Sequence, residues 1–164
     1  MANEYHKLSD TWILWFHDPY DTEWDLSSYK KIYEIDSVEV FWNIYNYIDK
    51  NLIVDGMFFV MKKGIDPMWE HKNNSDGGCW SYRVQKKNAY EAWLNLSMAL
   101  CGNTLTSEKY LKSINGISIS PKKSFCIIKI WNNNSKINDI KIINNIDKID
   151  NRESIYKAHK DRSY

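Results

Sequence analysis

Cysteine, proline and glycine are all scarce in this chain of 164 residues, which contains 3 Cys, 3 Pro and 6 Gly. The three cysteines, Cys79, Cys101 and Cys126, are odd in number and widely spaced. This spacing excludes a disulfide framework and a cysteine-rich metal site. Because free cysteines persist in a reducing compartment, we expect a cytoplasmic protein.

Charge of one sign is also lacking, since the formal net charge is only +1. This balance excludes a general nucleic-acid binder with a broad basic surface, although a small basic patch can still hold a few phosphates. No apolar run approaches the ~20 residues of a membrane-spanning helix, and residues 1–4 do not begin a signal peptide. We expect a soluble monomer with one domain over residues 1–164 and an ordered core over residues 6–159.

The signatures of common enzymes are missing as well. The chain has no glycine-rich phosphate loop, no HExxH or GxSxG motif and no cysteine pair at metal spacing. Its histidines keep no common register, and a lone histidine is more often a surface or core residue than a catalytic one. We therefore expect a binding protein and not an enzyme, with no cofactor and no bound metal.

Aromatic residues, in contrast, are abundant, with 8 Trp, 11 Tyr and 5 Phe. Most should fill a core, because aromatic side chains contribute much of the buried area. Runs of β-branched and aromatic residues predict strands over residues 11–16, 57–61, 80–85, 116–119, 125–131 and 154–159. Apolar residues at helical spacing, with Asp36 and Asn88 as capping residues, predict helices over 36–49, 88–101 and 107–112. We expect the strands over 57–61 and 80–85 to pair with each other.

Two polar loops carry tryptophans that we expect to be exposed. In the first, Pro67 restricts the backbone just before Trp69 and Glu70, which places a large indole beside a carboxylate. Trp24 lies in the second loop, among acidic residues. Two indoles can enclose a flat ligand, and the adjacent carboxylate favours a ligand that is cationic and donates hydrogen bonds.

The flanks of two predicted helices carry spare apolar residues. Val38 and Trp42 lie beside the core-facing stripe of the first helix, and Leu94 and Met98 lie beside that of the second. We expect these four side chains to converge on one patch on the back of the sheet. Such a patch is typical of a surface that binds an amphipathic partner helix.

Several segments of the chain form a recognisable set. They are His6-Lys7-Leu8, Trp12 to Phe16, Asp36 to Glu39 with Phe41-Trp42, Gly64 with Pro67-Met68-Trp69-Glu70, Gly77-Gly78 with Trp80, and Trp93-Leu94. With the placement of all eight tryptophans, this set resembles the initiation factor 4E family, the messenger-RNA cap-binding proteins of eukaryotic translation. The resemblance covers residues 6–131, and residues 155–159 resemble the last strand of the family.

The resemblance implies an α+β fold, in which about three helices pack on the convex face of a curved antiparallel β-sheet. The concave face is then expected to hold the 7-methylguanosine cap. Within that slot the resemblance implies Trp24 and Trp69 as the stacking pair, Glu70 as the reader of guanine and Trp131 as a neighbour of the methyl group. The residue chemistry agrees, because 7-methylguanine is a cationic purine whose edge can donate two hydrogen bonds to a carboxylate.

The resemblance also implies partners for the phosphates and for the back of the sheet. Lys122 matches a phosphate-binding arginine of the family, and Lys123 and Lys129 are further candidates to bind phosphate. Strand alternation puts Lys129 on the same side as Trp131. On the back, a scaffold initiation factor or a repressor peptide is expected to dock on the patch of Val38, Trp42, Leu94 and Met98.

The sequence departs from the family at positions that bear on both partners. Cys79 stands where a basic residue is usual, and Ser124 and Ile127 stand where lysines are usual, so we expect a weakened grip on phosphate. Lys7 replaces a proline and Asn95 an acidic residue on the docking surface. Partner choice is therefore expected to have drifted.

The expected function is to bind capped messenger RNA and to recruit it for translation initiation through a scaffold. One alternative is a cap-binding repressor that no longer engages the scaffold. Another is a reader of methylated lysine, because two indoles and an acid can also enclose a methylammonium group. The position of Glu70 beside the stacking pair favours the purine.

Overall fold

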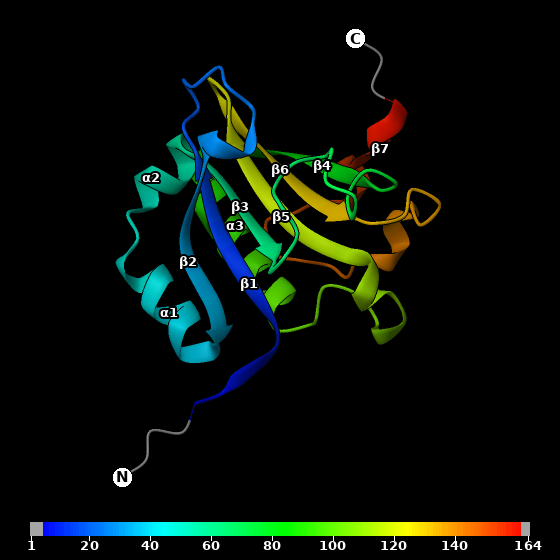
Figure 1. Cartoon of the computed structure of the whole chain (residues 1–164), viewed down its shortest axis with the longest axis horizontal. Helices are drawn as coiled ribbons and strands as arrows, with labels where there is room; N and C mark the ends of the chain where they lie inside the picture. The colour runs from blue at the N-terminus through cyan, green and yellow to red at the C-terminus, as the bar shows by residue number, and fades with distance from the viewer. Residues whose placement is uncertain (1–4, 162–164) are drawn as a thin grey trace.

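The computed structural model describes residues 5–161, which form a seven-stranded antiparallel sheet in the order β2-β1-β3-β5-β6-β4-β7 (Figure 1). The strands are β1 (Lys7–His17), β2 (Tyr29–Ser37), β3 (Met57–Lys62), β4 (Gly78–Gln85), β5 (Ile114–Pro121), β6 (Phe125–Asn132) and β7 (Ile155–Ala158). The α-helices of this part of the chain are α1 (Val38–Tyr47), α2 (Lys50–Asp55) and α3 (Lys86–Cys101). Short 3-10 helices occupy Leu26–Ser28, Glu108–Ser113, Ile140–Ile142, Asn151–Glu153 and His159–Asp161.

The helices cover one face of the sheet, as the predicted α+β class requires. Figure 1 shows α3 behind the strands and the loop between β3 and β4 in front of them. None of the described helices combines the length and the apolar character that a bilayer crossing needs.

Alternation along β1 explains why the sheet has a core on each face. Trp12 and Leu14 pack with Trp93 of α3 in the larger core, while Ile13 and Trp15 belong to a smaller cluster on the other face. Because successive side chains of a strand point to opposite faces, a strand buried on both faces is apolar at every position. The two-sided burial that the sequence of this strand predicts is confirmed.

The first helix begins one residue later than predicted. Ser37 is its N-cap, and the Ser37 hydroxyl accepts a hydrogen bond from the backbone nitrogen of Val40 at 3.1 Å. The assignment of the cap to Asp36 is therefore wrong. Glu39 has another role, because its carboxylate accepts a hydrogen bond from the backbone nitrogen of His6 at 3.1 Å. This contact joins the N-terminal segment to the start of α1.

The long helix α3 begins earlier than predicted and ends where predicted. Its N-cap is Gln85, so Asn88 lies inside the first turn and does not cap the helix. Gly102 is the C-cap, as predicted, although its φ of −87° is an ordinary value and the left-handed residue is the following Asn103, with φ 58°. The hydroxyl of Tyr45 on α1 donates a hydrogen bond to the Ser97 hydroxyl on α3 at 2.6 Å, which holds these two helices side by side.

The observed strand pairing differs in part from the pairing predicted from the sequence. The strands β3 and β4 do not pair, because β5 and β6 lie between them in the sheet. The hairpin of β5 and β6 and the edge position of β7 on β4 are confirmed. The edge strand β2 and the short helix α2 are additions that the sequence did not predict. Residues 137–149 contain only a short 3-10 helix and isolated bridges.

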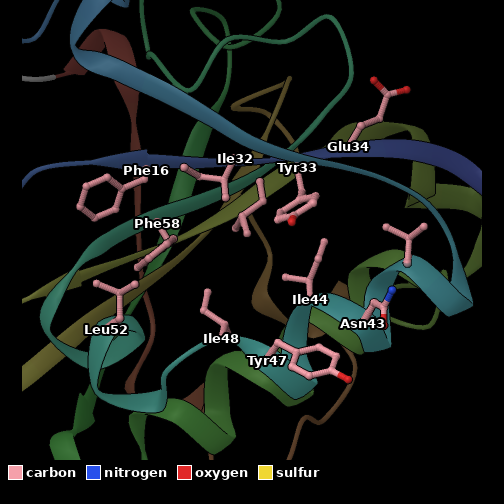
Figure 2. Close-up of a pocket in the computed structure, with 12 residues that line it drawn as sticks. Phe16, Ile32, Tyr33, Glu34, Asn43, Ile44, Tyr47, Ile48, Leu52 and Phe58 are labelled. Atoms are coloured by element: carbon pink, nitrogen blue, oxygen red, sulfur yellow. The ribbon is translucent and has the colours of Figure 1, made fainter.

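An apolar hollow of about 730 Å³ lies on the helical side of the sheet, between β2, α1 and α2 (Figure 2). Phe16 and Phe58 line it from the sheet, Ile44 and Ile48 from α1, and Leu52 from α2. The side chains of Phe16 and Phe58 point away from the concave face, so this hollow is separate from the tryptophan site described next.

Candidate functional site

The concave face carries an aromatic cluster on the side opposite to the helices. Its buried members include Trp15 from β1, Phe59 from β3 and Trp131 from β6. Tyr29 at the start of β2 and Trp69 from the loop between β3 and β4 pack against this cluster and remain partly exposed. The sheet therefore gathers tryptophans from distant parts of the sequence on one face.

Trp24 lies in the loop between β1 and β2 and keeps 51% of its surface exposed. Its ring stacks on His17, with 4.1 Å between ring centroids and 2° between the planes. His17 is fully buried, with Nε2 2.7 Å from the carbonyl oxygen of Glu23 and Nδ1 2.9 Å from that of Asp18. The imidazole therefore has a polar neighbour at each nitrogen, and its ring supports the exposed indole.

Tyr29 lies between the Trp24 loop and the aromatic cluster of the concave face. The ring of Tyr29 lies 6.4 Å from that of Trp24 and 4.7 Å from that of His17. Burial, followed by the negative charge of Glu70, raises the pKa of Tyr29 to about 12. Because β1 and β3 are antiparallel, the loops that follow them leave opposite ends of the sheet. Tyr29, which lies beside Trp24, and Trp69 nevertheless pack against the same aromatic cluster, so both loops border the concave face.

Hydrogen bonds hold the loop that carries Trp69. The buried side chain of Asn74 donates through Nδ2 to the carbonyl oxygens of Asp66 at 3.0 Å and Met68 at 2.9 Å. Asn115 of β5 in turn donates to Oδ1 of Asn74 at 2.8 Å. These bonds fix the backbone that precedes Trp69, so a ligand pays little to order the indole.

Trp131 forms part of the buried floor of the site. Its indole Nε1 donates a hydrogen bond to the Ser118 hydroxyl at 3.0 Å. The buried ring of His159 lies 5.1 Å from Trp131 and 6.5 Å from Trp69, between centroids. Cys79 is also buried, with Sγ 3.9 Å from Nε2 of His159. Cys79 therefore packs against a histidine and supplies no cation where the resemblance implies a basic residue.

The predicted lysines lie along the hairpin of β5 and β6. Lys122 and Lys123 are exposed at its turn. Lys129 is half-buried, opposite Ser81 of β4, and lies two residues from Trp131. Residues two apart on a strand share a face, so the structure agrees with the expected placement of Lys129 on the side of Trp131.

The apolar candidates on the helices are accessible to solvent. Val38 and Trp42 of α1 and Met98 of α3 are exposed, and Leu94 of α3 is half-buried. Because Tyr45 bonds α1 to α3, the two helices lie close enough for these side chains to share one surface. That they act together as a docking patch stays a prediction.

The residues that support the tryptophans carry no recognisable signal in the sequence. His17, Tyr29 and Asn74 belong to no motif, and their contacts with the two loops depend on how those loops fold back on themselves. Only its position could have pointed to His17, because it ends the first strand and precedes the Trp24 loop. Among residues 5–161, no three His, Cys, Asp or Glu side chains lie close enough to hold a metal ion.

A model of the family "Eukaryotic initiation factor 4E" matches residues 7–163. Initiation factor 4E-2 of Schizosaccharomyces pombe is 34% identical over 96% of this chain and 69% of its own length. Initiation factor 4E of Candida albicans is 33% identical over 79% of this chain and 65% of its own. The chain belongs to the eukaryotic initiation factor 4E family, and it spans about two thirds of the length of these curated relatives.

Solved structures of relatives have the same fold. The complex of Caenorhabditis elegans eIF4E-3 with the 4E-binding protein Mextli and a cap analog matches with a TM-score of 0.82 and 26% identity, over 96% of this chain and 95% of that one. The complex of Ascaris suum eIF4E-3 with m7G cap matches with a TM-score of 0.72 and 29% identity, over 80% of this chain and 76% of that one. The predicted family and the curved α+β sheet are therefore confirmed.

Proposed function

We propose that this protein binds the 7-methylguanosine cap of messenger RNA and recruits the message for translation through a scaffold partner. The main support is that Trp69 and Tyr29, the neighbour of Trp24, pack against one aromatic cluster on the concave face of a sheet of this family. Relatives of known structure were solved with a cap analog and with a 4E-binding protein. In this role the protein recognises a ligand and catalyses no reaction.

The proposed site reads the methylated base by stacking. Trp24 and Trp69 lie on the two faces of the purine, and methylation at N7 makes that purine a cation. A cation over an indole gains about 1 kcal/mol at an exposed site and about 2 kcal/mol when water is excluded. Because His17 and Asn74 already hold the two loops, little ordering opposes this gain.

Glu70 supplies the identity of the base. Its carboxylate accepts two hydrogen bonds from the ring N–H and the exocyclic amine of guanine, an arrangement that adenine cannot offer. Trp131 lies deeper, and its indole N–H is already bonded to Ser118. It therefore presents an apolar surface, which suits the N7 methyl group.

The scaffold partner is proposed to bind as a helix on α1 and α3. An amphipathic segment of the Tyr-x-x-x-x-Leu-hydrophobic type places its apolar residues on Val38, Trp42, Leu94 and Met98. The exposed indole of Trp42 is the largest of these side chains and is expected to act as the hot spot.

Retention on immobilised 7-methylguanosine triphosphate tests the proposal. The protein should elute with free cap analogue, but not with unmethylated guanosine triphosphate or a trimethyl-lysine peptide. Trp24→Ala, Trp69→Ala and Glu70→Ala should each lose most retention. Trp42→Ala removes an exposed indole from the opposite face, so it is the matched control and should bind as the wild type does.

Elution by the methyl-lysine peptide would instead favour the aromatic-cage function. Thermal melting of each variant distinguishes a binding defect from unfolding. Trp24 is half exposed and lies in a loop, so Trp24→Ala should melt close to the wild type. A collapsed transition would show that the indole belongs to the core.

A further inference from the structure

The concave face continues beyond Trp131 into a basic strip on β4, β6 and β7. Lys129 of β6, Arg83 of β4 and Lys157 of β7 lie on this face, in register with Ser81, Ile127 and Cys79 respectively. The sequences of these three strands contain no Asp and no Glu. Although the whole chain is almost neutral, this part of the sheet therefore attracts anions.

Arg83 and Phe125 form a stacking platform within the strip. The guanidinium carbon of Arg83 lies 3.9 Å from the centroid of the Phe125 ring. Arg83 is exposed and Phe125 is half-buried, so the stacked pair faces solvent. A guanidinium fixed in this way can stack a base or bind a phosphate with its N–H groups, and it loses little entropy in doing so.

The distances match a strand that leaves the cap site. Trp131 and Phe125 lie six residues apart on β6, which corresponds to about 20 Å along the strand. The two side chains share a face, with Lys129 and Ile127 between them. A chain that starts at the cap and runs along β6 meets first a lysine and then the platform.

We infer that Lys129 and Arg83 of the strip, with Phe125 stacked on Arg83, bind the ribose-phosphate chain and the first bases of the RNA attached to the cap. This inference rests on the proposed cap-binding function and extends it to a second part of the ligand. Charge complementarity and the stacked aromatic–arginine pair favour single-stranded RNA over a protein partner. The platform recognises stacking surfaces and phosphates, so it is not selective for sequence.

The test compares two ligands that differ only in the RNA. One is 7-methylguanosine triphosphate, and the other is a capped, unstructured oligoribonucleotide of about eight nucleotides, each titrated at two salt concentrations. Arg83→Gln removes the charge, and Arg83→Lys keeps the charge but removes the planar stack. Lys87→Gln on α3, an exposed lysine on the helical side of the sheet, is the matched control.

Wild type should bind the capped oligonucleotide more tightly than the nucleotide. Arg83→Gln should weaken binding of the capped oligonucleotide by about fivefold or more, since fivefold is the smallest loss expected when one base stack is removed. Binding of 7-methylguanosine triphosphate should be unchanged. It should also reduce the salt slope by about 0.7, the value for one phosphate contact of a single strand. Arg83→Lys should keep that slope and lose part of the affinity, and Lys87→Gln should change neither ligand.

Equal wild-type affinity for the two ligands would overturn the inference that this strip binds RNA. An Arg83→Gln variant that binds the oligonucleotide like the wild type would also overturn it. The failure of the cap proposal looks different, because wild type would then not bind the nucleotide at all. In that case an uncapped oligonucleotide still tests the strip, since its binding should depend on Arg83. An Arg83-independent result with that oligonucleotide would also overturn the inference.

Discussion

His17 should control cap affinity without touching the cap, because it holds Trp24 in place. His17→Ala removes the ring that stacks on Trp24 and the groups that contact the carbonyl oxygens of Glu23 and Asp18. We expect the indole to become mobile in the free protein. Ordering one such side chain on binding costs about 0.5–1.5 kcal/mol, which raises Kd by roughly 2- to 12-fold. Trp24→Ala removes the stack itself, and the loss should be larger, at about 1–3 kcal/mol.

The same substitution should also lower stability, since His17 is fully buried. Truncating a large buried ring and losing its hydrogen bonds should cost about 2–4 kcal/mol. For a chain of this size that corresponds to a fall in Tm of roughly 4–16 °C. His17→Phe keeps a ring under Trp24 and loses only the polar contacts, so it should bind cap within about twofold of the wild type while remaining less stable.

Quenching of tryptophan fluorescence by 7-methylguanosine triphosphate, measured well below each Tm, gives the affinities. Circular dichroism during heating gives the stabilities. The expected order of lost affinity is Trp24→Ala, then His17→Ala, then His17→Phe. An unchanged Kd in His17→Ala would refute the reasoning, because the position of Trp24 would then not depend on the imidazole beneath it.

The remaining predictions concern the partner surface, the phosphates and alkaline pH. Trp42→Ala should abolish binding of a fluorescent Tyr-x-x-x-x-Leu peptide and preserve cap binding; equal peptide affinity in both proteins would contradict the patch. Lys122→Ala and Lys129→Ala should each weaken the cap triphosphate more than the cap monophosphate, and an unchanged preference in Lys129→Ala would mean that this lysine points elsewhere. Burial raises the pKa of Cys101 from 9.0 to about 12. The unfolded chain therefore loses this proton first, and the free energy of unfolding should fall by up to ~1.4 kcal/mol per pH unit above pH ~9. Cys101→Ala should flatten that decline in urea titrations at increasing pH, and an identical slope would count against it.

The elements that the sequence predicted are those whose signal is local. The run Trp12 to Phe16 is apolar at every position, and the helices α1 and α3 show apolar residues at helical spacing over several turns. The strand β2 has no such signal, because Lys30, Lys31 and Glu34 make it polar and it is held as an edge strand by pairing with β1. The helix α2 has six residues and buries only Ile53, so it is too short for a periodicity to appear.

The residues of the candidate site also divide into those with a local signal in the sequence and those without one. Trp24, Trp69 and Glu70 could be selected because a polar or proline-containing loop rarely carries a large indole without a reason. Asn74 could not be selected, since its role depends on Asn115, which lies 41 residues away on β5. The expected pairing of β3 with β4 failed for a related reason. Their places on either side of one loop suggested that the two strands pair, whereas the sheet has β5 and β6 between them.

The placement of cations on β4 suggests how the ligand contacts of this chain are distributed. Cys79, at the position where the resemblance implies a basic residue, is buried beside His159, whereas Arg83 is exposed on the same face of the same strand. Four residues along a strand correspond to about 13 Å, so Arg83 of β4 lies well away from the level of Trp131 and closer to the turn that joins β5 and β6. Trp24, Trp69 and Glu70, which are proposed to read the base, are therefore separated from the positive charge of Arg83, which lies along the proposed path of the RNA. In this proposal a cap nucleotide contacts only the residues that read the base, whereas a capped oligonucleotide also contacts Arg83. The difference between the two affinities therefore measures how much Arg83 and its neighbours contribute to RNA binding beyond the cap.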